Sequence, residues 1–113
     1  MTAIRVSEVV GSKICVAAED GHTLHNVIAD RIQAKQDVQL SFAGVERLTT
    51  AFLNAAIGQL YGEFSEEQIR QHMQVIDATT AQLSLLKKVV DGAKRFFRDP
   101  KQYRANSGVD DEE

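Results

Sequence analysis

The fold is decided by residues 40–62, which read LSFAGVERLTTAFLNAAIGQLYG. An alternating pattern runs into this stretch from Asp37 and predicts a strand whose apolar side chains point one way: Val38, Leu40 and Phe42. The Ala-Gly pair that follows favours a turn. Apolar residues then recur at helical spacing, so we expect a helix to begin near Thr50, with Thr49 or Thr50 as its N-cap.

The helix expected over residues 50–64 has two unlike faces. One arc carries a core-facing stripe of Leu53, Ala56, Ile57, Leu60 and Phe64. The opposite arc carries only small, uncharged residues, namely Ala51, Ala55, Gly58 and Gly62. A solvated helix normally shows Lys, Glu or Arg there, and an interior Gly costs about 0.5–1 kcal/mol relative to Ala. We therefore expect this small-residue face to point outward and receive a second protein. The alternative is that both faces are covered within this chain.

The first part of the chain predicts two strands and a helix. Residues 3–7 and 13–16 alternate like strands on either side of Gly11, which suggests a hairpin. The pair Asp20-Gly21 reads as a turn. Helical spacing after it extends to residue 34 or 35 through Leu24, Val27, Ile28 and Ile32.

The second half predicts one more strand and one more helix. Residues 65–67 read as a polar break, and residues 69–76 as a strand. A helix capped by Thr79 or Thr80 follows to residue 97, with a seam of Leu83, Leu86, Val90, Ala93 and Phe97 that Leu85, Val89 and Phe96 widen. The order β-β-α-β-α-β-α indicates a small α/β domain with three helices. Its mixed sheet would have about four strands, the later ones parallel.

Residues 39–62 resemble the signature of STAS-like domains, relatives of the anti-sigma-factor antagonists, in which a strand and a short turn lead to a Ser/Thr pair that opens a helix. The resemblance extends over residues 3–97. It implies a bacterial, non-enzymatic regulatory domain that switches partners, with an ATPase of the anti-sigma-kinase type as the candidate partner. The contact residues would be Thr49, Thr50, Ala51, Asn54, Ala55, Gly58 and Gly62.

The better-known antagonists carry an Asp-Ser-Ser-Gly motif after the corresponding strand, and a partner kinase phosphorylates its second serine. The matching residues here are Thr49, Thr50, Ala51 and Phe52, so the usual acceptor is replaced by Ala51. The aromatic Phe52 resembles the uncharacterised STAS-like branch. Thr50 is the remaining candidate for phosphorylation, at a helix start that would stabilise a dianion. The alternative, which we favour, is that Thr49 or Thr50 serves only as the N-cap.

Composition and charge argue against several other classes of protein. A formal net charge of -3 gives no field that would gather nucleic acid, and no apolar run approaches the roughly 20 residues that a membrane span needs. We expect a cytoplasmic protein. Cys15 is the single cysteine and is expected to be a buried thiol. His22 and His25 lie three residues apart without a third ligand motif, so we expect no metal. The sequence has no Gly-rich phosphate loop and no nucleophile elbow, so we expect no cofactor and no catalytic group.

Residues 1–98 are expected to form the domain, and residues 99–113 an acidic, solvated tail ending in Asp110-Asp111-Glu112-Glu113. Two further hypotheses stay open. In one, the broad apolar face of the 79–97 helix, with Leu85, Val89 and Phe96, closes a homodimer. In the other, Thr49, Thr50 and backbone N–H groups bind a small anion.

Overall fold

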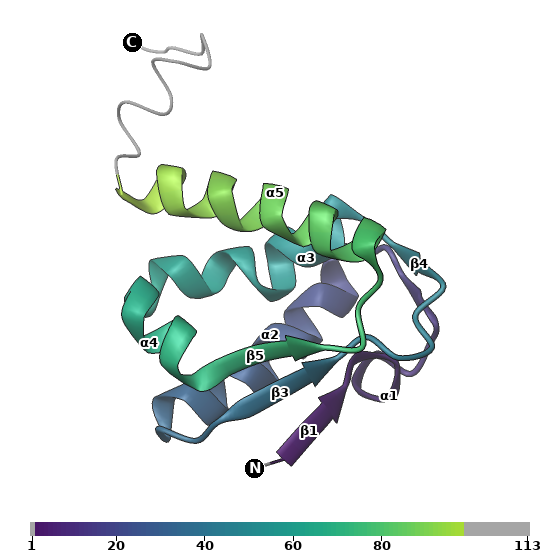
Figure 1. Cartoon of the computed structure of the whole chain (residues 1–113), viewed down its shortest axis with the longest axis horizontal. Coiled ribbons are helices and arrows are strands. Elements are labelled where there is room, and N and C mark those ends of the chain that lie inside the picture. Colours follow the sequence, from purple (N-terminus) through teal and green to yellow (C-terminus); the bar gives the residue numbers. More distant parts are fainter. Residues whose placement is uncertain (1, 99–113) are drawn as a thin grey trace, which may run out of the picture.

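Three parallel strands and a layer of helices make up the fold in the computed structural model, which describes residues 2–98 (Figure 1). The strands are β1 (Thr2–Arg5), β2 (Ile14–Cys15), β3 (Val38–Ser41), β4 (Arg47–Leu48) and β5 (Met73–Ile76). The helices are α1 (Val6–Val10), α2 (Ala18–Gln33), α3 (Thr50–Ala56), the 3₁₀ helix η1 (Gly58–Gly62), α4 (Glu66–His72) and α5 (Thr80–Arg98).

The main sheet has the order β1-β3-β5, and both of its strand pairs are parallel. Ile4, Leu40 and Val75 share one row across the three strands, and Ala3, Gln39 and Gln74 share the next. The first row is buried or half-buried, whereas the second is more exposed, so helices cover one face of the sheet. The β3 strand predicted from residues 37–42 is confirmed at Val38–Ser41.

The expected hairpin between the first two strands, and with it the mixed sheet, is wrong. Helix α1 occupies Val6–Val10 and separates β1 from β2. Strand β1 therefore pairs with β3, while β2 pairs in parallel with β4 as a separate two-stranded sheet. Gly11 ends α1 with φ 79°, a left-handed conformation that favours glycine. The break at Gly11 is thus a helix C-cap and not a hairpin turn.

Helix α2 is confirmed, but it begins at Ala18, before the predicted start. Gly21 is therefore a helical residue and not part of a turn. A Cβ at Gly21 would lie 2.8 Å from the Ala55 Cβ and would overlap the carbonyl oxygen of Phe52. This glycine consequently sets how closely α2 and α3 approach each other.

The strand predicted over residues 69–76 is half wrong, because helix α4 occupies Glu66–His72 and β5 begins only at Met73. Ser65 and Gln68 form a complete capping box at the start of α4, each side chain bonding the other residue's backbone N–H. Ser65 belongs to the stretch that was interpreted as a polar break, residues 65–67, and Gln68 follows it directly. A capping box, read as such, would have predicted the helix.

The chain leaves the sheet through Asp77, which has φ 57° although it is not glycine. Its carboxylate accepts a hydrogen bond of 2.7 Å from the Ser41 hydroxyl at the end of β3. Thr79 then caps α5: its hydroxyl accepts from the Gln82 N–H at 3.1 Å. These contacts direct α5 back across the molecule.

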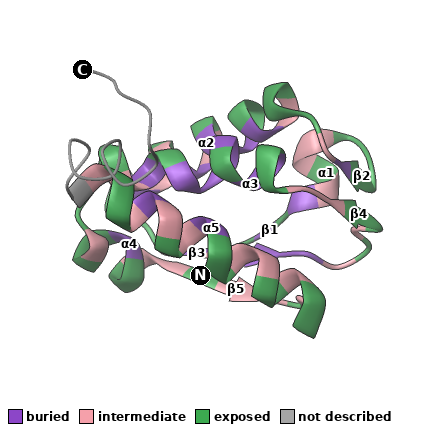
Figure 2. Cartoon of the chain, turned by 90° about the horizontal axis from the view of Figure 1, so that it is seen from above, coloured by how far each residue is buried: buried purple, intermediate pink, exposed green. Residues whose placement is uncertain are grey.

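Helix α5 lies along α3 and η1 and closes the core on that side (Figure 1). Figure 2 shows buried positions on α2, α3 and α5. The predicted seam of α5 is partly wrong, since Leu83 is 47% exposed, whereas Val89, assigned to the margin, is 4% exposed. The predicted tail, residues 99–113, lies outside the described residues.

Candidate functional site

The start of α3 confirms the predicted cap and separates the two threonines. Thr49 is the N-cap: its hydroxyl accepts from the Phe52 N–H at 3.2 Å and donates to the Val16 carbonyl at 2.8 Å. Thr50 is exposed and makes no hydrogen bond through its side chain to another residue of the described part of the chain. The Thr49 side chain is thus hydrogen-bonded within the fold, whereas Thr50 is exposed at the surface.

The small-residue face of the 50–64 helix is not an open surface, which corrects the main expectation from the sequence. Ala55 is 6% exposed because it packs against Gly21 of α2, and Gly58 is buried beneath α5. A Cβ at Gly58 would lie 3.7 Å from both Val89 Cγ1 and Ala93 Cβ. The alternative, in which this chain covers both faces, therefore holds for Ala55 and Gly58.

Gly62 is exposed, yet it too has an intramolecular reason to be glycine. A Cβ at Gly62 would lie 2.5 Å from the ring of Phe97. The predicted single helix also breaks at Ile57, where α3 gives way to the 3₁₀ helix η1. The core-facing stripe is confirmed for Leu53, Ala56, Ile57 and Leu60, which are fully buried, whereas Phe64 is only half-buried.

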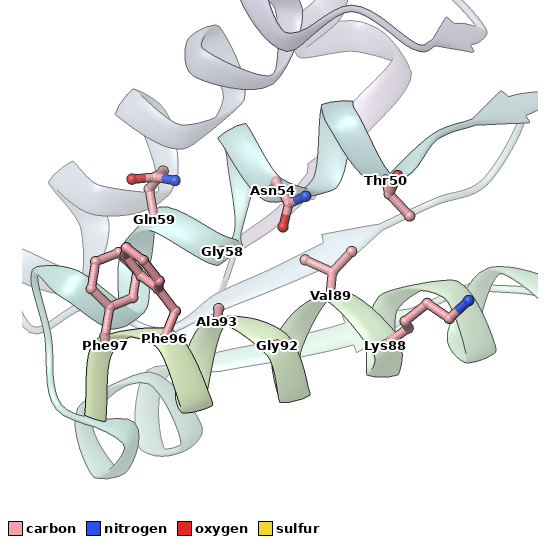
Figure 3. A pocket seen from close by; sticks show the side chains of 10 residues that line it. All are labelled: Thr50, Asn54, Gly58, Gln59, Lys88, Val89, Gly92, Ala93, Phe96 and Phe97. Atoms are coloured by element: carbon pink, nitrogen blue, oxygen red, sulfur yellow. The ribbon is translucent and has the colours of Figure 1, made fainter. Parts of the chain in front are cut away.

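What remains open is a groove between α3–η1 and α5, with a volume of about 350 Å³ (Figure 3). Its lining is Thr50, Asn54, Gly58 and Gln59 on one side and Lys88, Val89, Gly92, Ala93, Phe96 and Phe97 on the other. Thr50 and Lys88 lie at one end, and the two phenylalanines lie at the other near Gln59. Three of the seven predicted contact residues, Thr50, Asn54 and Gly58, are therefore brought together here.

The floor of the groove is formed by residues with small or no side chains, namely Gly58, Gly92 and Ala93. An added Cβ at Gly92 would meet nothing within 4 Å, so the space above this helical glycine is open. Phe96 is 37% exposed, and its ring meets that of Phe97 edge-on, with centroids 4.9 Å apart. The groove thus offers an apolar end, a flat middle and a polar end, a combination suited to contact with another polypeptide.

The charges around the groove are mainly positive and come from α5. Lys87 pairs with Asp91 at 2.9 Å, and this hydrogen bond holds the pKa of the Asp91 carboxyl below its usual value. Lys94 lies 3.6 Å from a Glu66 oxygen and 6.0 Å from the centre of the Tyr61 ring. Burial, helped by Glu66, raises the pKa of Tyr61. Among the described residues, no acidic side chain lines the groove itself.

The two histidines near the start of α2 do not converge. His22 is exposed, whereas His25 is 7% exposed and lies between α2 and the α3–η1 segment. Its Nδ1 is 3.3 Å from the Ala56 carbonyl and its Nε2 is 3.1 Å from the Glu63 carboxylate. Within residues 2–98 no three His, Cys, Asp or Glu side chains gather as metal ligands would.

The Cys15 thiol is buried, as predicted from the sequence. Burial raises its pKa, and Asp20 adds to the effect. A thiol of this kind is weakly nucleophilic because little of it is thiolate.

Sequence reasoning missed the contribution of α5 to the groove, in particular Lys88, Gly92 and Ala93. The available signal was Gly92, a glycine inside a long helical pattern, which lowers helix stability unless it has a packing or contact reason. Gln59 also lines the groove and was not predicted from the sequence.

These features define an α/β domain in which a buried strand, a glycine turn and a threonine-capped helix present a surface next to the C-terminal helix. The chain belongs to the family of STAS-like domains of unknown function (DUF4325), whose model matches residues 20–82. That range contains most of α2, all of β3, β4, α3, η1, α4 and β5, and the first residues of α5. No curated protein and no solved structure gives a significant match to the chain. In the described residues, no helix combines the length and apolarity required to cross a bilayer.

Proposed function

We propose that this STAS-like domain is a non-enzymatic regulatory module that binds a partner protein through the start of α3 and the groove beside it. The observation that carries the proposal is the groove, which is open and joins an exposed helix start to an aromatic end. Its lining contains no acidic side chain from residues 2–98. Its contact set differs from the predicted one. Thr50, Ala51 and Asn54 are retained, and Gly58 contributes to the floor of the groove. Gln59, Lys88 and Gly92 are added, whereas Ala55 is covered within the fold.

The candidate partner is an ATPase of the anti-sigma-kinase type, and its support is the family resemblance of the strand, turn and helix. The exposure of Thr50 also supports a kinase as the partner. A hydroxyl that is accessible and not engaged as a cap is available to a kinase, whereas the Thr49 hydroxyl already donates and accepts within the fold. We therefore retain Thr50 as the candidate phosphorylation site.

The contact surface can be tested by photo-crosslinking in cells that express the protein. A photoreactive amino acid replaces Asn54 in one variant and Asp30, an exposed residue of α2, in a matched control. We expect a crosslinked partner from position 54 and a much weaker one from position 30. The variant Gly92→Arg should remove that crosslink, because the added side chain would fill the groove without meeting a neighbour at its Cβ.

Circular dichroism establishes that Gly92→Arg is folded before its crosslinking is compared. If position 54 gives no more product than position 30, or if folded Gly92→Arg retains the full crosslink, the groove is not the contact surface. Incubation of the recovered ATPase with ATP and either the native protein or Thr50→Ala, followed by intact mass, tests the phosphorylation site. A phosphate present on both proteins would assign the modification elsewhere.

The homodimer alternative has less structural support. Of its three residues, Val89 is buried within the chain and Leu85 is half-buried. Leu83 and Phe96 are the exposed large apolar residues of α5 among those described, but they lie 13 positions apart, about 20 Å along the helix. They do not form one continuous patch.

A further inference from the structure

We propose that the acidic segment near the C-terminus of this chain, Asp110–Glu113, occupies the groove between α3–η1 and α5 and competes there with a partner. The segment belongs to residues 99–113, which follow directly after α5. The groove is therefore assigned an occupant from the same chain. The regulatory meaning of this contact rests on the proposed function, whereas the contact itself does not.

Charge is the first argument. Residues 87–98 of α5 contain five basic residues and one acidic residue: Lys87, Lys88, Lys94, Arg95 and Arg98, against Asp91. Residues 110–113 are four consecutive acidic residues. Opposite charges of this density attract over about 10 Å at 0.1 M salt. The acidic segment and the last turns of α5 are thus electrostatic complements.

The basic groups of α5 differ in whether they already have an acidic partner. Lys87 is paired with Asp91, and Lys94 with Glu66. Lys88 and Arg95 make no ion pair with another residue in the described range 2–98, and Lys88 lines the groove. Since the part of the chain that the structure describes places no acidic side chain in the groove lining, an incoming carboxylate meets Lys88 without repulsion from these walls.

The segment after α5 is long enough to bring its acidic residues to the groove. Lys88 lies ten residues before Arg98 in a continuous helix, a separation of about 15 Å along its axis. The twelve residues from 99 to 110 can span up to about 40 Å when extended. The chain is therefore long enough to reverse direction after α5, pass Phe96 and Phe97 and bring its acidic residues to Lys88. An occupant that is already tethered has an effective concentration on the order of millimolar.

The shape of the groove agrees with an extended occupant. Gly58, Gly92 and Ala93 leave a flat floor between its two ends. The open space above Gly92 admits a backbone where a larger residue would exclude it. A free partner would have to displace the tethered segment, so neutralising that segment should raise the apparent affinity for the partner, by about tenfold for a contact of this modest strength.

The contact is tested in the full chain by paramagnetic relaxation. Glu112→Cys provides one site for a nitroxide label, because Cys15 is buried and burial and Asp20 raise its pKa. The amide signals of Thr50, Asn54 and Gly92 should lose intensity at low salt and recover it in about 1 M NaCl, where screening shortens to about 3 Å. Lys88→Glu should restore the same signals at low salt.

The matched control carries the same label at the same position together with Asp110→Asn, Asp111→Asn and Glu113→Gln. Tethering is unchanged in this control, but the charge is removed, so the groove signals should keep their intensity. If the labelled control and the labelled acidic chain lose equal intensity, or if neither loses any, the segment does not occupy the groove. That result would leave the crosslinking test of the partner surface unaffected.

Discussion

Two glycines show how identical residues in helices serve opposite purposes. Gly21 is buried where α2 crosses α3, and it is required because a side chain there meets the backbone of Phe52. Gly92 lies in α5 under open space. Gly21 allows α2 and α3 to pack closely, whereas Gly92 leaves the groove beside α5 open.

We predict that Gly21→Ala and Gly92→Ala change stability in opposite directions. Alanine at position 21 forces α2 and α3 apart, so unfolding free energy should fall by about 1–3 kcal/mol, the range found for overpacked cores. Alanine at position 92 should raise it by about 0.5–1 kcal/mol, because a helical alanine loses less entropy than glycine. Urea denaturation measures both. A neutral Gly21→Ala would show that the helix crossing adapts without cost.

The small residues Ala55 and Gly58 explain why the sequence predicted the wrong exposure. An uncharged face of small side chains suits close contact, whether the other surface comes from a partner or from the same chain. The complement was present in α5, where Val89 and Ala93 cover Gly58, but helical periodicity does not reveal which helices meet. The stripe of Leu53, Ala56, Ile57 and Leu60 was predicted correctly because large apolar residues must be buried in either case.

Among the elements, those with a strong local pattern were predicted and those defined by distant partners were not. Helix α2, strand β3 and the start of α3 follow from periodicity and a threonine cap. Strand β1 was located, but its pairing with β3 was not, since no local feature distinguishes a hairpin strand from a parallel one when a short helix intervenes. The α3–η1 break at Ile57 likewise depends on tertiary packing.

The two threonines at the start of α3 give a second prediction. Thr49→Ala removes the bond to the Phe52 N–H and leaves the Val16 carbonyl without its donor, so unfolding free energy should fall by about 1–2 kcal/mol. Thr50→Ala should change it by no more than about 0.5 kcal/mol, as expected for an exposed residue. Thermal and urea unfolding compare the two. Equal losses would contradict the assignment of Thr49 as the cap.

The arrangement of exposed apolar residues bears on the oligomeric state. Leu83 and Phe96 are separated along α5, and the intervening Val89 and Ala93 are buried against α3 and η1. Stable dimers usually bury a continuous apolar core. The described surface of α5 provides none.

We therefore expect sedimentation velocity to give one monomeric species over a wide range of protein concentration. Raising the salt should leave that distribution unchanged, because the contact proposed for the acidic segment lies within one chain. A tight dimer that Leu85→Glu dissociates would instead support the homodimer hypothesis and remove the groove from consideration as a site for a different protein.

The parallel register has a consequence for how the protein folds. Every paired strand meets a segment 33 to 36 residues away, so no sheet contact forms between neighbours in the sequence. Closing such long loops is entropically unfavourable before any strand pair is gained, and domains of this kind fold more slowly than helical bundles. The crossing of α2 and α3 brings Gly21 beside Ala55, a comparable separation in sequence, so loop length does not favour this helix packing over strand pairing.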